Sequence, residues 1–140
     1  MKANELMLGD YVRFKHGIDK VVGISWVPGL GDCAWFAASA TLFPESVEDV
    51  NPIPITPEIL EKNGFRNVSN HTLKGHDTYE LSFGEDNDQR ITYKLGDYFQ
   101  YWSYDDRWYK LFETQICHKW CVHQLQHALR LCGIDKEIVI

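Results

Sequence analysis

The 140-residue sequence lacks the features that most directly assign a function. Its first ten residues contain no apolar run like that of a secretion signal, and no window approaches a membrane span. It has no glycine-rich phosphate loop, no Gly-x-Ser-x-Gly motif and no Cys-x-x-Cys motif. It has no basic segment, and a formal charge of -6 argues against binding by phosphate neutralisation. These absences predict a cytoplasmic protein without a catalytic motif or cofactor site, and they disfavour a nucleic-acid partner.

Residues 115–133 hold three of the four cysteines together with three of the six histidines. His123 and His127 stand at i, i+4, the spacing with which the His-Glu-x-x-His helix of zinc peptidases binds its metal. Gln124 takes the place of the catalytic glutamate, and an amide cannot accept a proton from a metal-bound water. We therefore predict no metal and no catalysis here. A metal-binding protein or metal-dependent hydrolase that uses His123 and His127 is kept as an alternative.

We expect residues 116–132 to form an amphipathic helix. At about 100° per residue, one apolar sector of roughly 80° contains Cys117, Cys121, Leu125, Ala128 and Cys132. The cysteines are then small core residues of a protein in a reducing compartment. The two histidines fall on the opposite, polar side, so we expect a solvated pair whose replacement changes stability by no more than about 0.5 kcal/mol.

The first part of the chain, residues 6–55, reads as short strands separated by Gly, Asp and Pro. We expect strands near residues 8–14, 19–27, 33–40 and 47–55, with Pro52 and Pro54 confining the last one to an edge. This pattern predicts a small SH3-like β-barrel unit over residues 1–55.

Residues 56–140 predict a helix, an antiparallel sheet and a C-terminal helix, either as a second unit or as part of one compact domain. Thr56 can cap a helix over residues 57–63, which Asn63 and Gly64 would end. Tyr79, Leu81 and Phe83 then alternate with polar residues, as in a sheet with one buried face. Since such a face needs a cover, we expect the helix at 116–132 to supply it. The predicted fold class is α+β.

Residues 97–112 form the most aromatic stretch of the sequence and predict a hairpin. If Asp105 and Asp106 form a two-residue turn, Trp102 pairs with Tyr109 on one side of the sheet. Phe99 would then pair with Phe112 on the core side. One outer face would carry four side chains of the kinds enriched at binding hot spots: Trp102, Tyr104, Arg107 and Tyr109. Packing of this face on the N-terminal unit is the alternative.

Three blocks of the sequence, residues 1–12, 52–65 and 122–134, resemble uncharacterised small proteins of gut Bacteroidetes and of their phages and integrated elements. The blocks read MKANELMLGDYV, PIPITPEILEKNGF and VHQLQHALRLCGI. The resemblance spans nearly the whole chain and implies a bacterial cytoplasmic protein of mobile-element origin. No activity or site residue comes with it.

The function that the sequence predicts is a non-enzymatic interaction or accessory module with a protein partner. The alternatives are the metal-dependent protein described above and a single-stranded nucleic-acid binder, in which aromatic side chains would stack on bases.

Overall fold

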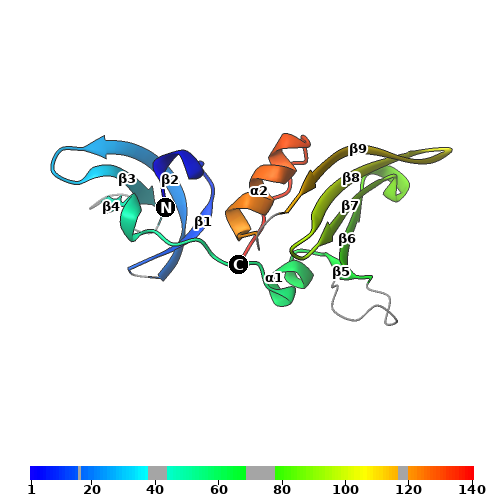
Figure 1. Ribbon diagram of the computed structural model, residues 1–140, viewed down its shortest axis with the longest axis horizontal. Helices are drawn as coiled ribbons and strands as arrows, with labels where there is room; N and C mark the ends of the chain where they lie inside the picture. The colour runs from blue at the N-terminus through cyan, green and yellow to red at the C-terminus, as the bar shows by residue number, and fades with distance from the viewer. Residues whose placement is uncertain (16, 38–43, 69–77, 117–119) are drawn as a thin grey trace. The chain divides into compact units, whose positions relative to one another are not determined.

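The computed structural model describes residues 1–15, 17–37, 44–68, 78–116 and 120–140 (Figure 1). They form two antiparallel sheets and one C-terminal helix, so the predicted α+β class is confirmed. The chain divides into two compact units, Met1–Pro54 with Cys121–Ala128 and Ile55–Trp120 with Leu129–Ile140. Within the described ranges, no helix has the length and apolar character needed to cross a bilayer.

The first unit contains a four-stranded sheet in the order β1-β2-β3-β4. The strands are β1 (Tyr11–Phe14), β2 (Gly17–Val27), β3 (Gly31–Phe36) and β4 (Glu45–Ser46), with short 3-10 helices at η1 (Ala3–Glu5) and η2 (Val47–Asp49). Among the described residues this sheet is not closed into a barrel, so the structure does not show the SH3-like barrel. The predicted strand at 47–55 is wrong, because Ser46 Oγ accepts the Glu48 N–H and starts η2 instead.

The hydrophobic core of the first unit is a cluster of buried apolar side chains from the sheet and from the segments beside it. Phe14 and Phe36 stack with ring centroids 4.1 Å apart. The cluster of buried apolar residues comprises Leu6, Val12, Phe14, Val21, Ala34, Phe36, Val47 and Val50. The alternation of β1 places Val12 and Phe14 in this cluster, as a half-buried strand requires.

Helix α1 (Pro57–Lys62) begins the second unit and has the predicted caps. Thr56 Oγ1 accepts the Ile59 N–H at 3.3 Å, and Pro57 occupies the first turn. Gly64, at φ +87°, ends the helix while Phe65 N–H bonds to the Leu60 carbonyl at 3.0 Å.

The second unit contains a five-stranded sheet in the order β5-β6-β7-β8-β9. Its strands are β5 (Arg66–Asn67), β6 (Thr78–Phe83), β7 (Gln89–Lys94), β8 (Tyr98–Asp105) and β9 (Arg107–Gln115), and η3 (Glu85–Asn87) connects β6 to β7. One face is apolar as predicted, and it buries Tyr79, Leu81, Ile91, Tyr93 and Phe99. Trp120 packs on this face, with ring centroids 5.9 Å from Tyr93 and 5.7 Å from Phe99.

The predicted register of the β8–β9 hairpin is wrong by one residue. Only Asp106, at φ +61°, stands between the paired residues Asp105 and Arg107. Tyr104 therefore pairs with Trp108 rather than with Arg107. A bulge on β9 then shifts the register again, so that Phe112 returns to the face of Phe99, with ring centroids 6.1 Å apart.

Helix α2 (Val122–Leu131) is shorter than the predicted helix at 116–132. The Ile116 N–H bonds to the Asp97 carbonyl, which keeps residue 116 outside the helix. Gln124 Oε1 accepts the Cys121 N–H at 2.8 Å and caps the start. At the other end Gly133 has φ +71°, and the Ile134 N–H reaches the Leu129 carbonyl in a Schellman motif. Gln124, which lacks the chemistry of a catalytic glutamate, thus has a structural role.

Asn63 is a buried polar side chain that ties α1 to the C-terminal segment. Its Nδ2 donates to the Ile59 and Val139 carbonyls at 2.7 and 2.8 Å, and its Oδ1 accepts the Val139 N–H at 2.8 Å. We expect Asn63→Ala to lower the free energy of unfolding by about 2–4 kcal/mol, because the substitution removes all three hydrogen bonds of this buried side chain. Urea denaturation measures this loss. Lys62→Ala, at an exposed position of the same helix, is the control, and an equal effect of both variants would contradict the assignment.

Candidate functional site

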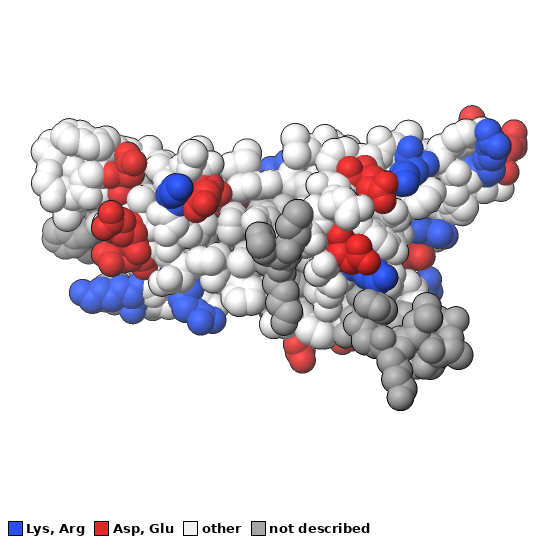
Figure 2. Space-filling model, in the orientation of Figure 1, with Lys and Arg blue, Asp and Glu red and all other residues white. Residues whose placement is uncertain are grey.

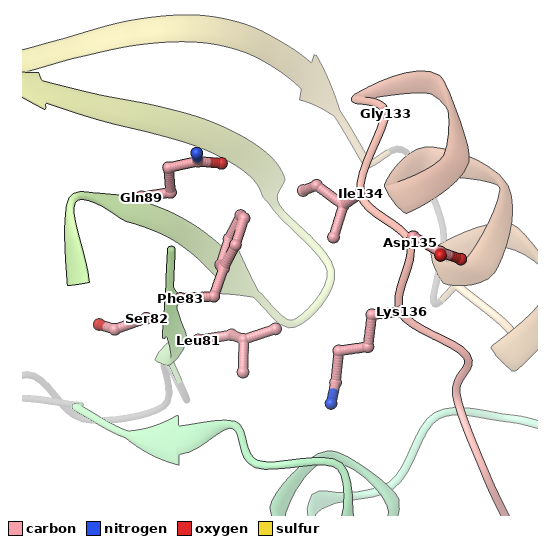
Figure 3. A pocket seen from close by; sticks show the side chains of 8 residues that line it. All are labelled: Leu81, Ser82, Phe83, Gln89, Gly133, Ile134, Asp135 and Lys136. Carbon is pink, nitrogen blue, oxygen red and sulfur yellow. The ribbon is translucent and has the colours of Figure 1, made fainter. Parts of the chain in front are cut away.

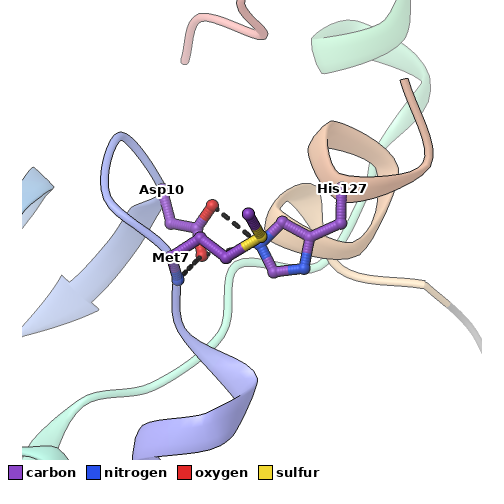
Figure 4. A network of polar contacts seen from close by, with 3 residues as sticks. All are labelled: Met7, Asp10 and His127. Atoms are coloured by element: carbon purple, nitrogen blue, oxygen red, sulfur yellow. Dashed lines mark hydrogen bonds and ion pairs between the residues drawn. The ribbon is translucent and has the colours of Figure 1, made fainter. Parts of the chain in front are cut away.

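A buried carboxylate and a histidine meet in the first unit (Figure 4). Asp10, which directly precedes β1, has no exposed surface. Its Oδ2 accepts the Met7 N–H at 2.8 Å, and both carboxylate oxygens lie 2.9 Å from His127 Nε2 on α2. Because a carboxylate only accepts, His127 donates its Nε2 proton to Asp10. A charge-assisted contact of this kind is stronger than an ordinary hydrogen bond.

His123 lies one turn before His127 and is 6% exposed. The two rings are 5.6 Å apart and nearly perpendicular, and the buried Nδ1 of His123 has no hydrogen-bond partner among the described residues. Burial lowers the pKa of His123, and the nearby His127 lowers it further, while Asp10 and Glu5 oppose the shift. The expectation of a solvated histidine pair is therefore wrong. The helical periodicity placed both residues on the polar side of α2, but it could not show that Asp10 lies against that side.

The chemistry of this cluster is that of a structural contact. Across the described part of the chain, no three His, Cys, Asp or Glu side chains are arranged to hold a metal ion. Nε2 of His127 is already bonded to the Asp10 carboxylate and, among the described residues, does not face a metal position. Cys121 and Cys132 are half-buried rather than fully buried, and burial raises the pKa of both thiols. Cys117 lies outside the described residues.

A second candidate site is the polar side of the five-stranded sheet, which we call the aromatic face and define by Arg90, Trp102, Tyr104, Trp108 and Lys110. The observed register brings these side chains together. The Arg90 guanidinium lies 4.0 Å from the Trp108 ring, which in turn is 5.3 Å from the Tyr104 ring. The Lys110 ammonium lies 5.9 Å from the ring of Trp102. Each of the two tryptophans is thus paired with a cation.

Ion pairs fix the cations of the aromatic face. Glu80 lies 3.3 Å from Arg90 Nε. Lys110 Nζ is 2.7 Å from Glu113 Oε2, and Gln100 donates to the other oxygen of Glu113 at 2.8 Å. The bonds from Lys110 and Gln100 lower the pKa of Glu113. The rings of the aromatic face therefore lie within a network of fixed polar contacts.

The structure divides the four predicted binding residues between the two sides of the hairpin. Trp102 and Tyr104 lie on the aromatic face. Arg107 and Tyr109 lie on the other side, where the guanidinium is 4.8 Å from the Tyr109 ring. Sequence reasoning missed Arg90 and Trp108. The alternation around Ile91 and Tyr93 could have placed Arg90 on the polar side, whereas placing Trp108 required the register.

The edge of β9 is poorly suited to pairing with a strand of another molecule. Among the described strands, β9 pairs only with β8. Its bulge interrupts a regular edge, and Lys110 adds a charge; both are features that protect edge strands from pairing. Leu111, at the bulge, is 58% exposed.

A hollow of about 440 Å³ lies in the second unit between β6 and the segment after α2 (Figure 3). It is open to solvent. Its lining includes Leu81, Phe83, Gln89, Ile134 and Lys136. Gln89 accepts the Tyr101 hydroxyl at 2.8 Å and is therefore partly committed to the fold. Among the described lining residues the polar side chains point in different directions, so the hollow does not define a ligand.

Charges of both signs are intermixed on the surface. Figure 2 shows acidic and basic side chains close to one another on the face in view. On the aromatic face the acids Glu80 and Glu113 likewise accompany the basic residues. Binding there would depend on rings and paired polar groups more than on net charge.

The contact between Asp10 and His127 is tested by a double-mutant cycle. We expect Asp10→Ala to lower the free energy of unfolding by about 2–4 kcal/mol, because the Met7 N–H and His127 both lose their acceptor. The coupling energy with His127→Ala should be about 1–3 kcal/mol. Leu131→Ala, at a position of the same helix that is 79% exposed, is the control. Additive effects of the Asp10 and His127 substitutions would contradict the contact.

Metal analysis of protein purified without a histidine tag tests the alternative use of His123 and His127. We expect less than about a tenth of an equivalent of zinc, because two imidazoles fall short of the three or four ligands of protein zinc sites. A stoichiometric metal that both His123→Ala and His127→Ala remove would contradict this prediction.

Comparison with protein-family models, with curated proteins and with solved structures gives no match for this chain. The functional argument therefore rests on the residues themselves.

Proposed function

We propose that the protein is a non-enzymatic interaction module that binds a partner protein through the aromatic face. The observation that carries the proposal is the cluster of Trp102, Tyr104 and Trp108 on one side of the five-stranded sheet. Trp, Tyr and Arg are the residues most enriched among binding hot spots, and the aromatic face contains all three types.

The geometry supports binding because the cations beside the rings are ion-paired before a partner arrives. Arg90 is held by Glu80 and stacks on Trp108, and Lys110 is held by Glu113 beside Trp102. A side chain that is already ordered loses less conformational entropy on binding. Tyr104 remains 49% exposed and offers apolar surface together with a hydroxyl group. A partner would therefore meet aromatic surface with ion-paired side chains beside it.

The alternative explanation for these rings is that they only stabilise the sheet by packing across neighbouring strands. Aromatic pairs opposite each other on neighbouring strands contribute about 0.2–1 kcal/mol to a sheet. The Tyr104–Trp108 pair lies at the end of β8, beyond the last β7–β8 pair at Ser103. A role limited to the sheet would leave partner binding unchanged when Tyr104 is replaced.

The proposal also covers the location of the protein, its genetic origin and the fold type of its first unit. We place the protein in the bacterial cytoplasm and assign it to a phage or mobile element, on the resemblance of its three sequence blocks. We interpret the first unit as SH3-like, which its antiparallel order β1-β2-β3-β4 supports. A single-stranded nucleic acid stacking on Trp102 and Tyr104 is the alternative ligand, and the metal-dependent protein is the alternative function.

Tyr104 and Tyr109 provide a matched test, since they are 49% and 43% exposed on opposite sides of the same hairpin. We expect Tyr104→Ala to weaken capture of the partner about tenfold or more, as at a binding hot spot. Tyr109→Ala should leave capture unchanged. Quantitative affinity capture from a lysate of the source cells measures both, with urea denaturation to show equal stability.

Three outcomes would contradict the proposal. Equal capture by the wild type and Tyr104→Ala would remove the aromatic face as the binding surface. Loss of binding in Tyr109→Ala alone would move the site to the other side of the hairpin. Retention of a single-stranded oligonucleotide in a low-salt gel shift, lost in Tyr104→Ala, would favour the nucleic-acid alternative.

A further inference from the structure

We infer that Asp10, His127 and His123 form a pH-sensitive latch that holds the start of α2 in the first unit at neutral pH and weakens in mild acid. The inference concerns a regulatory device separate from the proposed binding face, since none of the three residues belongs to that face. The residues come from two distant parts of the chain that Asp10 and His127 join directly (Figure 4).

The latch acts where α2 is attached to the first unit. The Val122 N–H bonds to the Ile53 carbonyl at 2.8 Å, and Cys121 forms an antiparallel bridge with Pro54. The Asp10–His127 contact fixes the following turn of the helix. On the other side, the Asp10 carbonyl accepts the Val21 N–H at 2.8 Å, and the Gly9 N–H donates to the Val21 carbonyl at 2.7 Å. Two backbone hydrogen bonds therefore link β2 to the loop whose Asp10 contacts the histidine pair.

The cluster can accommodate one positive charge more easily than two. A positive charge on His127 would face the buried Asp10 carboxylate, whose Oδ2 lies 2.9 Å from Nε2. Protonation of His123 would place a second charge in a ring centred 5.6 Å from the first, at a site 6% exposed. Among the described residues, the ionisable groups whose charges act on His123 are Asp10, His127 and Glu5. Burial of His123 and the neighbouring His127 both disfavour a proton on His123.

The direction of the pH effect follows from proton linkage. The folded pKa of His123 lies below its ordinary value of 6.5, because burial disfavours the charged ring. Unfolding then takes up a proton when the pH lies between the folded and the unfolded pKa. The contribution of His123 to stability is complete above about pH 6.5 and is lost progressively as the pH falls through that window. Mild acid should thus favour release of the segment that carries His123.

The first experiment measures unfolding of the wild type in urea at pH 7.5, 6.5 and 5.5, alongside His123→Gln and His123→Leu. We expect the unfolding equilibrium constant of the wild type to rise below pH 6.5 with a slope of up to about tenfold per pH unit, the limit for one proton. Both His123 variants should show a smaller slope than the wild type. Glu5→Gln, which keeps His123 but removes one neighbouring charge, should retain the wild-type direction.

NMR titration of the wild type provides a second test that does not depend on folding of the variants. The ring signals of His123 should report a pKa below 6.5, and amide signals of residues 122–128 should change in the same acidic range. A His123 pKa at or above 6.5 would overturn the inference. Identical pH slopes in the wild type, His123→Gln and His123→Leu would overturn it as well.

Discussion

The pairing register of β8 and β9 decides which side chains the second sheet presents to solvent. In the observed register Trp108 and Lys110 lie on the side of Trp102, whereas Arg107 and Tyr109 lie on the other side. A shift by one residue would exchange these sets, because side chains alternate between the two faces of a strand. The single residue Asp106 at the turn sets this register, and the bulge on β9 returns Phe112 to the core side. The turn thus assembles the aromatic face while the bulge preserves the core.

The two units use buried polar groups in a similar way. Asn63 in the second unit joins α1 to the C-terminal segment through three hydrogen bonds, and Asp10 in the first unit joins the start of β1 to α2. Both side chains connect segments far apart in sequence, and both are almost fully buried. Buried polar groups of this kind favour one specific arrangement, because any alternative leaves them without partners. The partner of Asp10 is a histidine, His127, on α2.

The sequence predicted those features that depend on local chemistry. Thr56, Pro57 and Gly64 fixed the ends of α1, and the alternation of Tyr79 and Leu81 identified the buried face of the second sheet. The sequence could not give the β8–β9 register, because the pair Asp105–Asp106 is compatible with more than one turn and the bulge at Leu111 has no signal of its own. It also could not give the partner of His127, since Asp10 is 117 residues away. Both candidate sites depend on these pairings, which explains why the fold was predicted better than the sites.

The measurement that tests this account most directly is a set of NMR distances across the β8–β9 hairpin. The account predicts nuclear Overhauser contacts between the side chains of Tyr104 and Trp108, and between Trp102 and Lys110. Contacts of Trp102 with Tyr109 in their place would contradict it, because they would restore the two-residue turn and separate Trp108 from the aromatic face.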